Sequence, residues 1–219
     1  MHKSIKNLED INREISLKVK ENISPTIIAV SKTFKIQDIL PLIKHGHTHY
    51  GENKVQEAIE KWSDIKTEYP NIKLHLIGGL QTNKVKFAVK IFDYIHSVDS
   101  EKLAKKISEE QLKQNKKIKI FIQVNLGEEK QKSGILKLDL ENFYKYCKSL
   151  DLDILGLMCI PPVNKDSKIF FQELNLLNQK LNLKELSMGM SSDYISATEY
   201  HSTFLRIGSK IFGERITKF

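Results

Sequence analysis

The chain has 219 residues, and its 35 Lys and Arg residues outnumber 27 Asp and Glu residues to give a formal net charge of +8. A chain of this length can bury a substantial core without disulfide bonds, and its two cysteines, Cys147 and Cys159, lack the spacing of metal ligands. No apolar run approaches the roughly 18 residues that cross a bilayer, and the N-terminus lacks the apolar core of a signal peptide. We therefore expect a cytoplasmic protein with two reduced thiols, no metal site and no membrane span.

The first segment predicts an amphipathic helix over about residues 5–21. Its apolar residues recur every three or four positions, as on one face of a helix: Ile5, Leu8, Ile11, Ile15 and Val19. Pro25 then leads into a short apolar, β-branched run at residues 27–30. Such a run is typical of a parallel strand that is buried on both faces.

Predicted strands and helices alternate from there to the end of the chain. Strands are expected at residues 27–30, 47–50, 73–77, 94–98, 118–125, 154–160, 185–188 and 203–207, and the second is expected to break at Gly51. Helices are expected near residues 36–44, 53–66, 82–91, 100–115, 138–149, 166–181 and 192–200.

Eight strands separated by helices predict an α/β fold, a single (β/α)8 TIM barrel that spans residues 1–219. An open doubly wound sheet is the alternative, but the dinucleotide fingerprint G-x-G-x-x-G is missing from the sequence. In a barrel, the residues that carry chemistry lie in the loops at the carboxyl ends of the strands.

Lys32 follows the first strand at the point where burial should end, and it would therefore stand at the mouth of a site. An amine beside apolar walls loses hydration, which lowers its pKa and leaves part of it unprotonated and able to attack an aldehyde. The alternative is that Lys32 is one lysine among many and extends from a strand end into solvent.

Two polar residues near the next strands have competing interpretations. Glu52 and Asn53, in the segment Y-G-E-N-K, are expected at the start of a helix, where Asn53 is either an N-cap or a ligand contact. His75, on the third strand, is expected to point into the barrel as a hydrogen-bonded core residue. Gly78 and Gly79 follow it and permit a tight backbone path.

Two glycine junctions near the C-terminus predict a phosphate site. Residues 187–193 read S-M-G-M-S-S-D, and residues 206–213 read R-I-G-S-K-I-F-G. Each places hydroxyl and amide donors at the start of a helix, where the N–H groups and the dipole favour an anion. Loops after strands seven and eight of barrels commonly hold phosphate. A serine N-cap would explain Ser191 or Ser192, but it gives no reason for the second junction.

Arg206 lies within the last predicted strand, where burial is costly unless the guanidinium meets an anion, a carboxylate or a ring-nitrogen acceptor. A reactive lysine and a phosphate site on one barrel describe a ligand with both an aldehyde and a phosphate. Pyridoxal 5′-phosphate (PLP) carries both groups. An arginine that donates to its pyridine nitrogen would keep that nitrogen unprotonated and weaken the ring as an electron sink.

Seven motifs, in order over nearly the whole chain, resemble those of the pyridoxal phosphate homeostasis proteins. They are A-V-S-K-T (29–33), G-E-N-K-V-Q-E (51–57), H-L-I-G-x-L-Q-T-N-K (75–84), K-S-G-I (132–135), G-L-M-C-I-P (156–161), L-S-M-G-M-S-S-D (186–193) and R-I-G-S-K-I-F-G (206–213). The resemblance implies one barrel of the alanine racemase N-terminal kind (fold type III), with PLP held as an aldimine on Lys32.

The resemblance also implies the other cofactor-binding residues. Phosphate contacts are expected from Ser191, Gly208 and Ser209, and a contact to the pyridine nitrogen from Arg206. Asn53 and Met190 are expected to line the cofactor site.

The chain departs from the family pattern at two positions. Gly79 stands where His or Pro is usual, and His201 replaces a glycine at a helix C-terminus, where a positive φ is common.

The resemblance implies a role in intracellular PLP homeostasis: a monomer that stores PLP or delivers it to PLP-dependent apo-enzymes, without amino-acid turnover. The alternative is a PLP-dependent amino-acid racemase. Such an enzyme needs a second acid/base, typically a tyrosine from an additional β-domain, for which 219 residues leave no room.

A nucleic-acid binder is a third hypothesis, which rests on the net charge alone. Lysines alternate with glutamates on the helix predicted at residues 100–115, and aromatic stacking motifs are missing from the sequence, so we expect no nucleic-acid partner.

Overall fold

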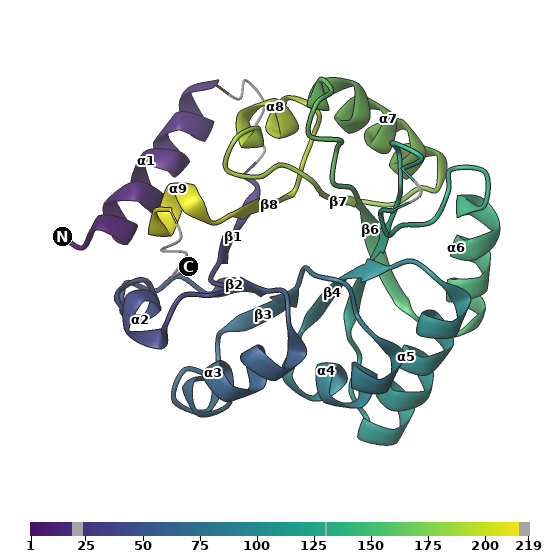
Figure 1. The fold of residues 1–219 in the computed structure, drawn as a ribbon, viewed down its shortest axis with the longest axis horizontal. Coiled ribbons are helices and arrows are strands. Elements are labelled where there is room, and N and C mark those ends of the chain that lie inside the picture. Colours follow the sequence, from purple (N-terminus) through teal and green to yellow (C-terminus); the bar gives the residue numbers. More distant parts are fainter. Residues whose placement is uncertain (19–23, 130, 215–219) are drawn as a thin grey trace.

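The computed structural model describes residues 1–18, 24–129 and 131–214. Eight parallel strands pair in chain order to form a closed barrel, and Figure 1 shows helices arranged around it. The strands are β1 (Thr26–Val30), β2 (His49–Glu52), β3 (Lys73–Leu76), β4 (Tyr94–Val98), β5 (Lys119–Gln123), β6 (Asp153–Met158), β7 (Glu185–Ser187) and β8 (Phe204–Ile207). The predicted (β/α)8 barrel is confirmed.

A helix follows each strand, and one more precedes the barrel. The helices are α1 (Lys3–Lys18), α2 (Ile36–Lys44), α3 (Val55–Glu68), α4 (Val85–Ile91), α5 (Glu101–Gln114), α6 (Leu140–Ser149), α7 (Ser167–Lys180), α8 (Tyr194–Glu199) and α9 (Ser209–Phe212). A 3₁₀ turn, η1 (Thr82–Lys84), forms the start of the helix predicted at 82–91. Residues 19–21 of the first predicted helix lie outside the described residues.

The second strand lies two residues later than predicted, and it does not break at Gly51. Gly51 pairs with Val30 on one side and His75 on the other, inside the barrel wall. A Cβ at this position would lie 2.9 Å from Ile28 Cγ2. The glycine therefore permits close packing within the strand and does not end it.

The core has two parts. The larger apolar cluster lies between the strands and the surrounding helices, and it includes Trp62 and Phe171. A smaller cluster of residues from β1, β4, β5, β6 and β8 fills the barrel interior: Ile28, Tyr94, Phe121, Met158 and Phe204. Cys147 and Cys159 are free and buried, and burial raises the pKa of both thiols to about 12.

Helix α1 packs beside α8 and α9, the two helices that follow the last strands (Figure 1). Its predicted apolar face is buried at Leu8, Ile11 and Ile15. Glu14 accepts hydrogen bonds from the Tyr194 hydroxyl and from Lys210 Nζ, which is 2.9 Å away. These two bonds lower the pKa of Glu14 to about 2. The N-terminal helix therefore braces the two C-terminal helices.

The two departures from the family pattern fit the backbone. His201 has a φ of 66°, which confirms the expected left-handed conformation at the end of α8. A Cβ at Gly79 would meet nothing within 4 Å, so a larger side chain fits there. In the part of the chain that the structure describes, no helix combines the length and apolar character needed to cross a membrane.

His47 gives the fold a testable pH dependence. It lies before β2, with Nε2 2.9 Å from the carbonyl oxygen of His49, and burial lowers its pKa from 6.5 to about 4. The unfolded chain therefore takes up a proton at a higher pH than the folded protein does. The stability that the neutral ring contributes is complete above pH 6.5 and is lost as the pH falls toward 4, by up to about 3 kcal/mol.

We expect His47→Gln, which keeps an N–H donor but does not titrate, to reduce the drop in unfolding free energy between pH 6.5 and 4. Urea unfolding of both proteins across this range measures the difference. Other buried histidines leave a residual slope in the variant. Equal slopes in the two proteins would show that His47 does not titrate between the folded and unfolded states.

Candidate functional site

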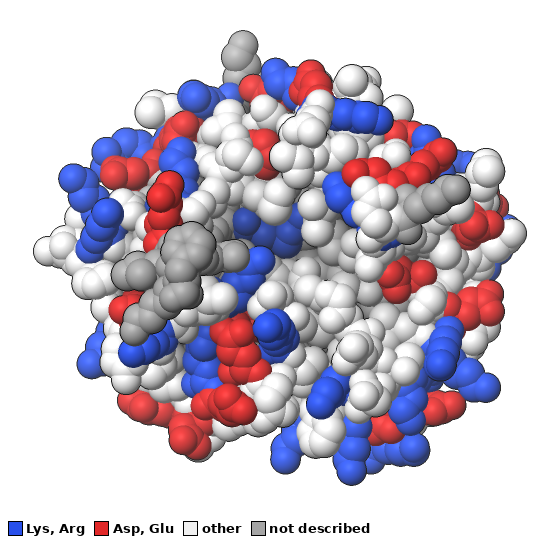
Figure 2. Space-filling model, in the orientation of Figure 1, with Lys and Arg blue, Asp and Glu red and all other residues white. Residues whose placement is uncertain are grey.

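A cavity of about 440 Å³ lies at the carboxyl ends of the strands. Six of the seven residues predicted to bind cofactor line it: Lys32, Met190, Ser191, Arg206, Gly208 and Ser209. Apolar side chains complete the wall, among them Val30, Phe34, Ile77 and Ile160. Figure 2 shows Lys and Arg side chains in the hollow near the middle of the face that it displays. The loop after β1 and the last strand, β8, thus bring two basic side chains, Lys32 and Arg206, to one cavity.

Asn53, the seventh residue, is not part of the cavity lining. The N-cap of α3 is Lys54, so the N-cap interpretation of Asn53 is wrong. Its Oδ1 is buried and has no hydrogen-bond partner among the described residues. Gly78 packs so closely against it that a Cβ there would lie 2.5 Å from the Asn53 carbonyl oxygen. The ligand contact predicted for Asn53 stays a prediction.

The two glycine junctions are joined by a serine hydroxyl. Ser191 Oγ accepts the backbone N–H groups of Gly208, at 3.2 Å, and Lys210, at 3.3 Å. The N-cap position of α8 belongs to Asp193, so the interpretation of Ser191 or Ser192 as the cap is wrong. Helices α8 and α9 have six and four residues, so their dipoles are small. The local N–H and hydroxyl groups therefore provide the polar character of this wall.

Arg206 is buried in the barrel wall with neutral partners. Only 4% of it is exposed, and burial lowers the pKa of its guanidinium. One terminal nitrogen donates to Ser187 O at 2.6 Å and Ser187 Oγ at 2.7 Å, and the other donates to Cys159 O at 2.8 Å. These three bonds use three of the five N–H groups of a guanidinium, which cannot accept a hydrogen bond. The site thus contains a buried cation whose partners carry no charge.

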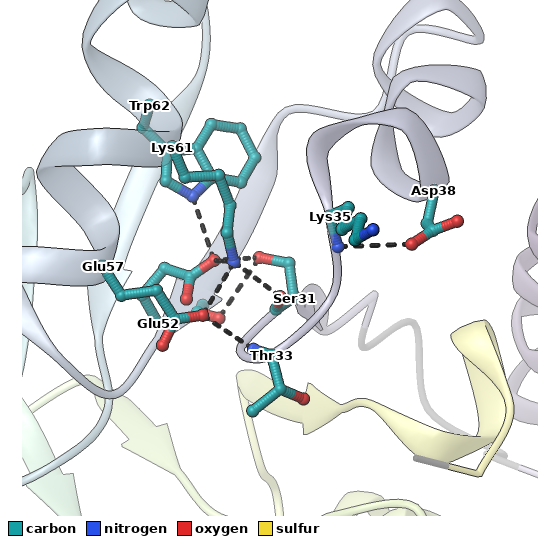
Figure 3. Close-up of polar contacts among 9 residues, drawn as sticks. Ser31, Thr33, Lys35, Asp38, Glu52, Glu57, Lys61 and Trp62 are labelled. Atoms are coloured by element: carbon teal, nitrogen blue, oxygen red, sulfur yellow. Dashed lines mark hydrogen bonds and ion pairs between the residues drawn. The ribbon is translucent and has the colours of Figure 1, made fainter. Parts of the chain in front are cut away.

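Glu52 lies in the wall below Lys32, as the last residue of β2 and not in a helix as predicted. It is fully buried, and its Oε1 accepts hydrogen bonds from Ser31 Oγ (2.7 Å), Lys61 Nζ (2.9 Å) and Trp62 Nε1 (3.0 Å). Figure 3 shows these groups converging on the carboxylate. A buried carboxylate with an ammonium partner is stable only while that partner remains.

Lys61 and Glu57 extend this network to the backbone on both sides of Lys32 (Figure 3). Lys61 Nζ donates to Ser31 O and to Glu57 Oε1, each at 3.0 Å. Glu57 Oε1 also accepts the N–H of Thr33 at 2.7 Å. Thr33 has a φ of 71°, a conformation that β-branched residues rarely adopt. The network therefore holds a strained turn directly after the lysine.

Sequence reasoning missed this network. The spacing of Glu57 and Lys61 is that of an ion pair on one helix face, which was a usable signal. No local sequence signal indicated that Glu52, a carboxylate at the end of a strand, would bind Lys61. In the described part of the chain, no three His, Cys, Asp or Glu side chains are grouped to hold a metal ion.

We expect Lys61→Met to reduce the free energy of unfolding by about 3 kcal/mol, because it leaves Glu52 buried without its ammonium partner. Adding Glu52→Gln should recover part of this loss. Lys145→Met is the matched control, since it breaks an exposed pair with Glu141 and should cost less than about 0.5 kcal/mol. Urea unfolding measures all three variants, and equal effects of the two single lysine substitutions would contradict a structural role for the buried network.

Comparison with known proteins supports one family. Residues 7–216 match the family of the alanine racemase N-terminal domain. The pyridoxal phosphate homeostasis protein of Vibrio alginolyticus is 36% identical over 203 residues, with 88% of this chain and 87% of that protein covered. The protein of the same name from Mus musculus is 38% identical over 215 residues, with 88% and 78% covered.

A solved structure extends the likeness to the whole fold. The structure of PipY from Synechococcus elongatus, described as having PLP bound, matches with a TM-score of 0.83 and 35% identity. The match covers 92% of this chain and 98% of PipY. By its motifs, its closed barrel and these matches, the chain belongs to the pyridoxal phosphate homeostasis proteins of the alanine racemase N-terminal domain family.

Proposed function

We propose that this chain binds PLP covalently through Lys32 and serves the intracellular homeostasis of that cofactor, by storing it or by delivering it to PLP-dependent apo-enzymes. The observation that carries the proposal is the convergence of Lys32, Arg206 and the Ser191 junction on one cavity of about 440 Å³. The names of the relatives and the PLP-bound PipY structure support the same ligand.

The residues of the cavity fit the groups of PLP. The amine of Lys32 suits the aldehyde, with which it would condense with loss of water. The Ser191 hydroxyl proton and the backbone N–H of Ser209 suit the phosphate, and Ser191 Oγ, which accepts the N–H groups of Gly208 and Lys210, holds the two junctions together beside it. Gly208 approaches β1 so closely that a Cβ would lie 3.3 Å from Val30 Cβ, which favours a bare backbone at this wall. Apolar side chains such as Met190 and Ile160 suit the faces of the ring.

The proposal includes binding without amino-acid turnover. The electron sink that bound PLP supplies is strongest when its ring nitrogen is protonated. Arg206 can only donate, so facing that nitrogen it would keep the nitrogen unprotonated. The homeostasis names of the relatives support this assignment over a racemase. The cytoplasmic location, the monomeric state and the apo-enzyme partners stay predictions.

The covalent link is tested by adding PLP to the purified protein, reducing with borohydride and mapping the labelled peptide by mass. We expect the label on Lys32 and its loss in Lys32→Ala, together with the visible absorbance of bound PLP. Lys35→Ala is the matched control, because Lys35 is an exposed lysine three residues away that does not line the cavity, and it should label as the wild type does. A label that persists in a folded Lys32→Ala protein would assign the link to another lysine.

The phosphate role of the two junctions is tested with Ser191→Ala. Removing the hydroxyl that binds the N–H groups of Gly208 and Lys210 should weaken PLP binding about tenfold, as expected for loss of one charge-assisted hydrogen bond. Binding of pyridoxal, which has the aldehyde but no phosphate, should change by less than about twofold. Absorbance titrations with both ligands give the two affinities. Equal weakening for both ligands would place the effect of Ser191 elsewhere than at the phosphate.

A further inference from the structure

Three histidine rings form a continuous row of hydrogen bonds through the interior of the barrel. His49 Nδ1 lies 2.9 Å from His75 Nε2, and His75 Nδ1 lies 2.9 Å from His96 Nε2. His96 Nδ1 lies 2.8 Å from Ser187 Oγ, which also accepts a bond from Arg206. The row thus joins β2, β3, β4, β7 and β8 and ends at a residue that lines the main cavity.

The chemistry of Arg206 gives this row one direction. A guanidinium can only donate, so Ser187 Oγ accepts from Arg206. The serine proton then has one acceptor among the described groups, His96 Nδ1. A neutral ring that accepts at Nδ1 carries its proton on Nε2, and His96 therefore donates to His75 Nδ1. The same step repeats from His75 to His49.

We propose that His96, with His75 and His49 behind it, is a positioning residue for Arg206: the row of rings, each protonated at Nε2, holds the Ser187 hydroxyl so that its oxygen faces the guanidinium. The opposite direction would aim two donors at Ser187 Oγ and leave the serine proton without a partner in a buried place, which is costly. In the proposed direction, each donor and each acceptor nitrogen in the row from Ser187 to His49 Nδ1 takes part in one hydrogen bond.

Packing holds the rings in this arrangement. His75 stacks on Tyr94 with ring centroids 4.1 Å apart, and His96 stacks on Phe121 at 4.4 Å. Burial lowers the pKa of His75 and of His96 well below 6.5, so both rings remain neutral, as the row requires. At its other end, His49 lines a hollow of about 280 Å³ together with His47. The relay, His49–His75–His96–Ser187, therefore runs from that hollow to Arg206, which lines the cavity of Lys32.

The direction of the relay is tested without PLP. Nitrogen NMR of histidine-labelled protein at pH 8 distinguishes a protonated ring nitrogen from a bare one, and single substitutions assign the signals. We expect His49, His75 and His96 each to carry the proton on Nε2. A proton on Nδ1 of any of the three rings would overturn the relay. A role in core packing alone would not require the three rings to share one tautomer.

The positioning role rests on the proposed function and is tested by PLP affinity in two variants of one residue. His96→Phe keeps a ring beside Phe121 but removes the acceptor for Ser187, and it should weaken PLP binding about tenfold. His96→Asn places an amide oxygen near the position of Nδ1 and should bind within about threefold of wild type. Equal affinities of the Phe and Asn variants would overturn the positioning role.

Ser187→Ala keeps the comparison decisive if His96→Phe does not fold. It should weaken PLP binding about as much, and adding His96→Phe to it should weaken binding little further, because both remove the same link. Wild-type affinity in Ser187→Ala would overturn the positioning role. A wild-type protein that takes up no PLP would contradict the proposed function, whereas the NMR result would still decide the direction of the relay.

Discussion

Pairing of β1 with β8 closes the barrel, and the candidate site depends on this closure. Ile28 lies opposite Arg206, and Ala29 lies opposite Ile207, so the two strands end side by side. The loop with Lys32 therefore begins beside the loop that begins at Gly208, although the two are separated by most of the chain. In an open sheet β1 and β8 would be edges, and the amine and the phosphate junctions would lie far apart. Closure of the barrel therefore brings the loop with Lys32 and the loop that begins at Gly208 to the same cavity.

The sequence predicted those parts of the fold and site that depend on local signals. Seven of the eight strands lie close to their predicted positions and the second lies two residues later, while the stripe at Leu8, Ile11 and Ile15 predicted α1. Glycine followed by serine marked the two junctions whose backbones lie in the cavity wall. Errors arose where a residue's role was set by tertiary contacts. Gly51 looked like a strand end because glycine usually weakens strands, but here it allows close contact with Ile28.

The buried polar networks could not be predicted because each joins residues that are far apart in the chain. Glu52 meets Lys61 only when α3 packs on β2, and burial of a strand carboxylate contradicts the usual pattern. His75 taken alone was correctly expected to be a hydrogen-bonded core residue. Its partners lie on neighbouring strands, and their alignment requires the register of the closed barrel. The position of a residue in a strand indicates on which face of the sheet its side chain lies. It does not indicate which other side chains it contacts on that face.

The two networks hold two different residues of the same cavity. One holds Ser31 and Thr33, and so fixes the backbone around Lys32, through Lys61 and Glu57. The other fixes a buried guanidinium through a serine and a row of neutral rings. Both consist of mostly buried hydrogen bonds, which are stronger in a low dielectric and resist reorganisation, although Glu52 Oε2 has no hydrogen-bond partner among the described residues. The backbone around Lys32 and the guanidinium of Arg206, the two groups proposed to bind the aldehyde and the ring nitrogen of PLP, are therefore held in position by the fold itself.

Such preorganisation bears on what a PLP carrier needs. When a site becomes ordered only on binding, the free energy spent on ordering lowers its affinity for the ligand. The same order must be lost again when the ligand leaves. Here the polar wall at Arg206 is formed by contacts within the protein, and Ser191 already joins the two phosphate junctions. Under the proposed function, uptake and release of PLP at Lys32 would then need little rearrangement of the barrel. A rigid cavity of this kind favours reversible holding of a reactive aldehyde, which is the property that storage and delivery share.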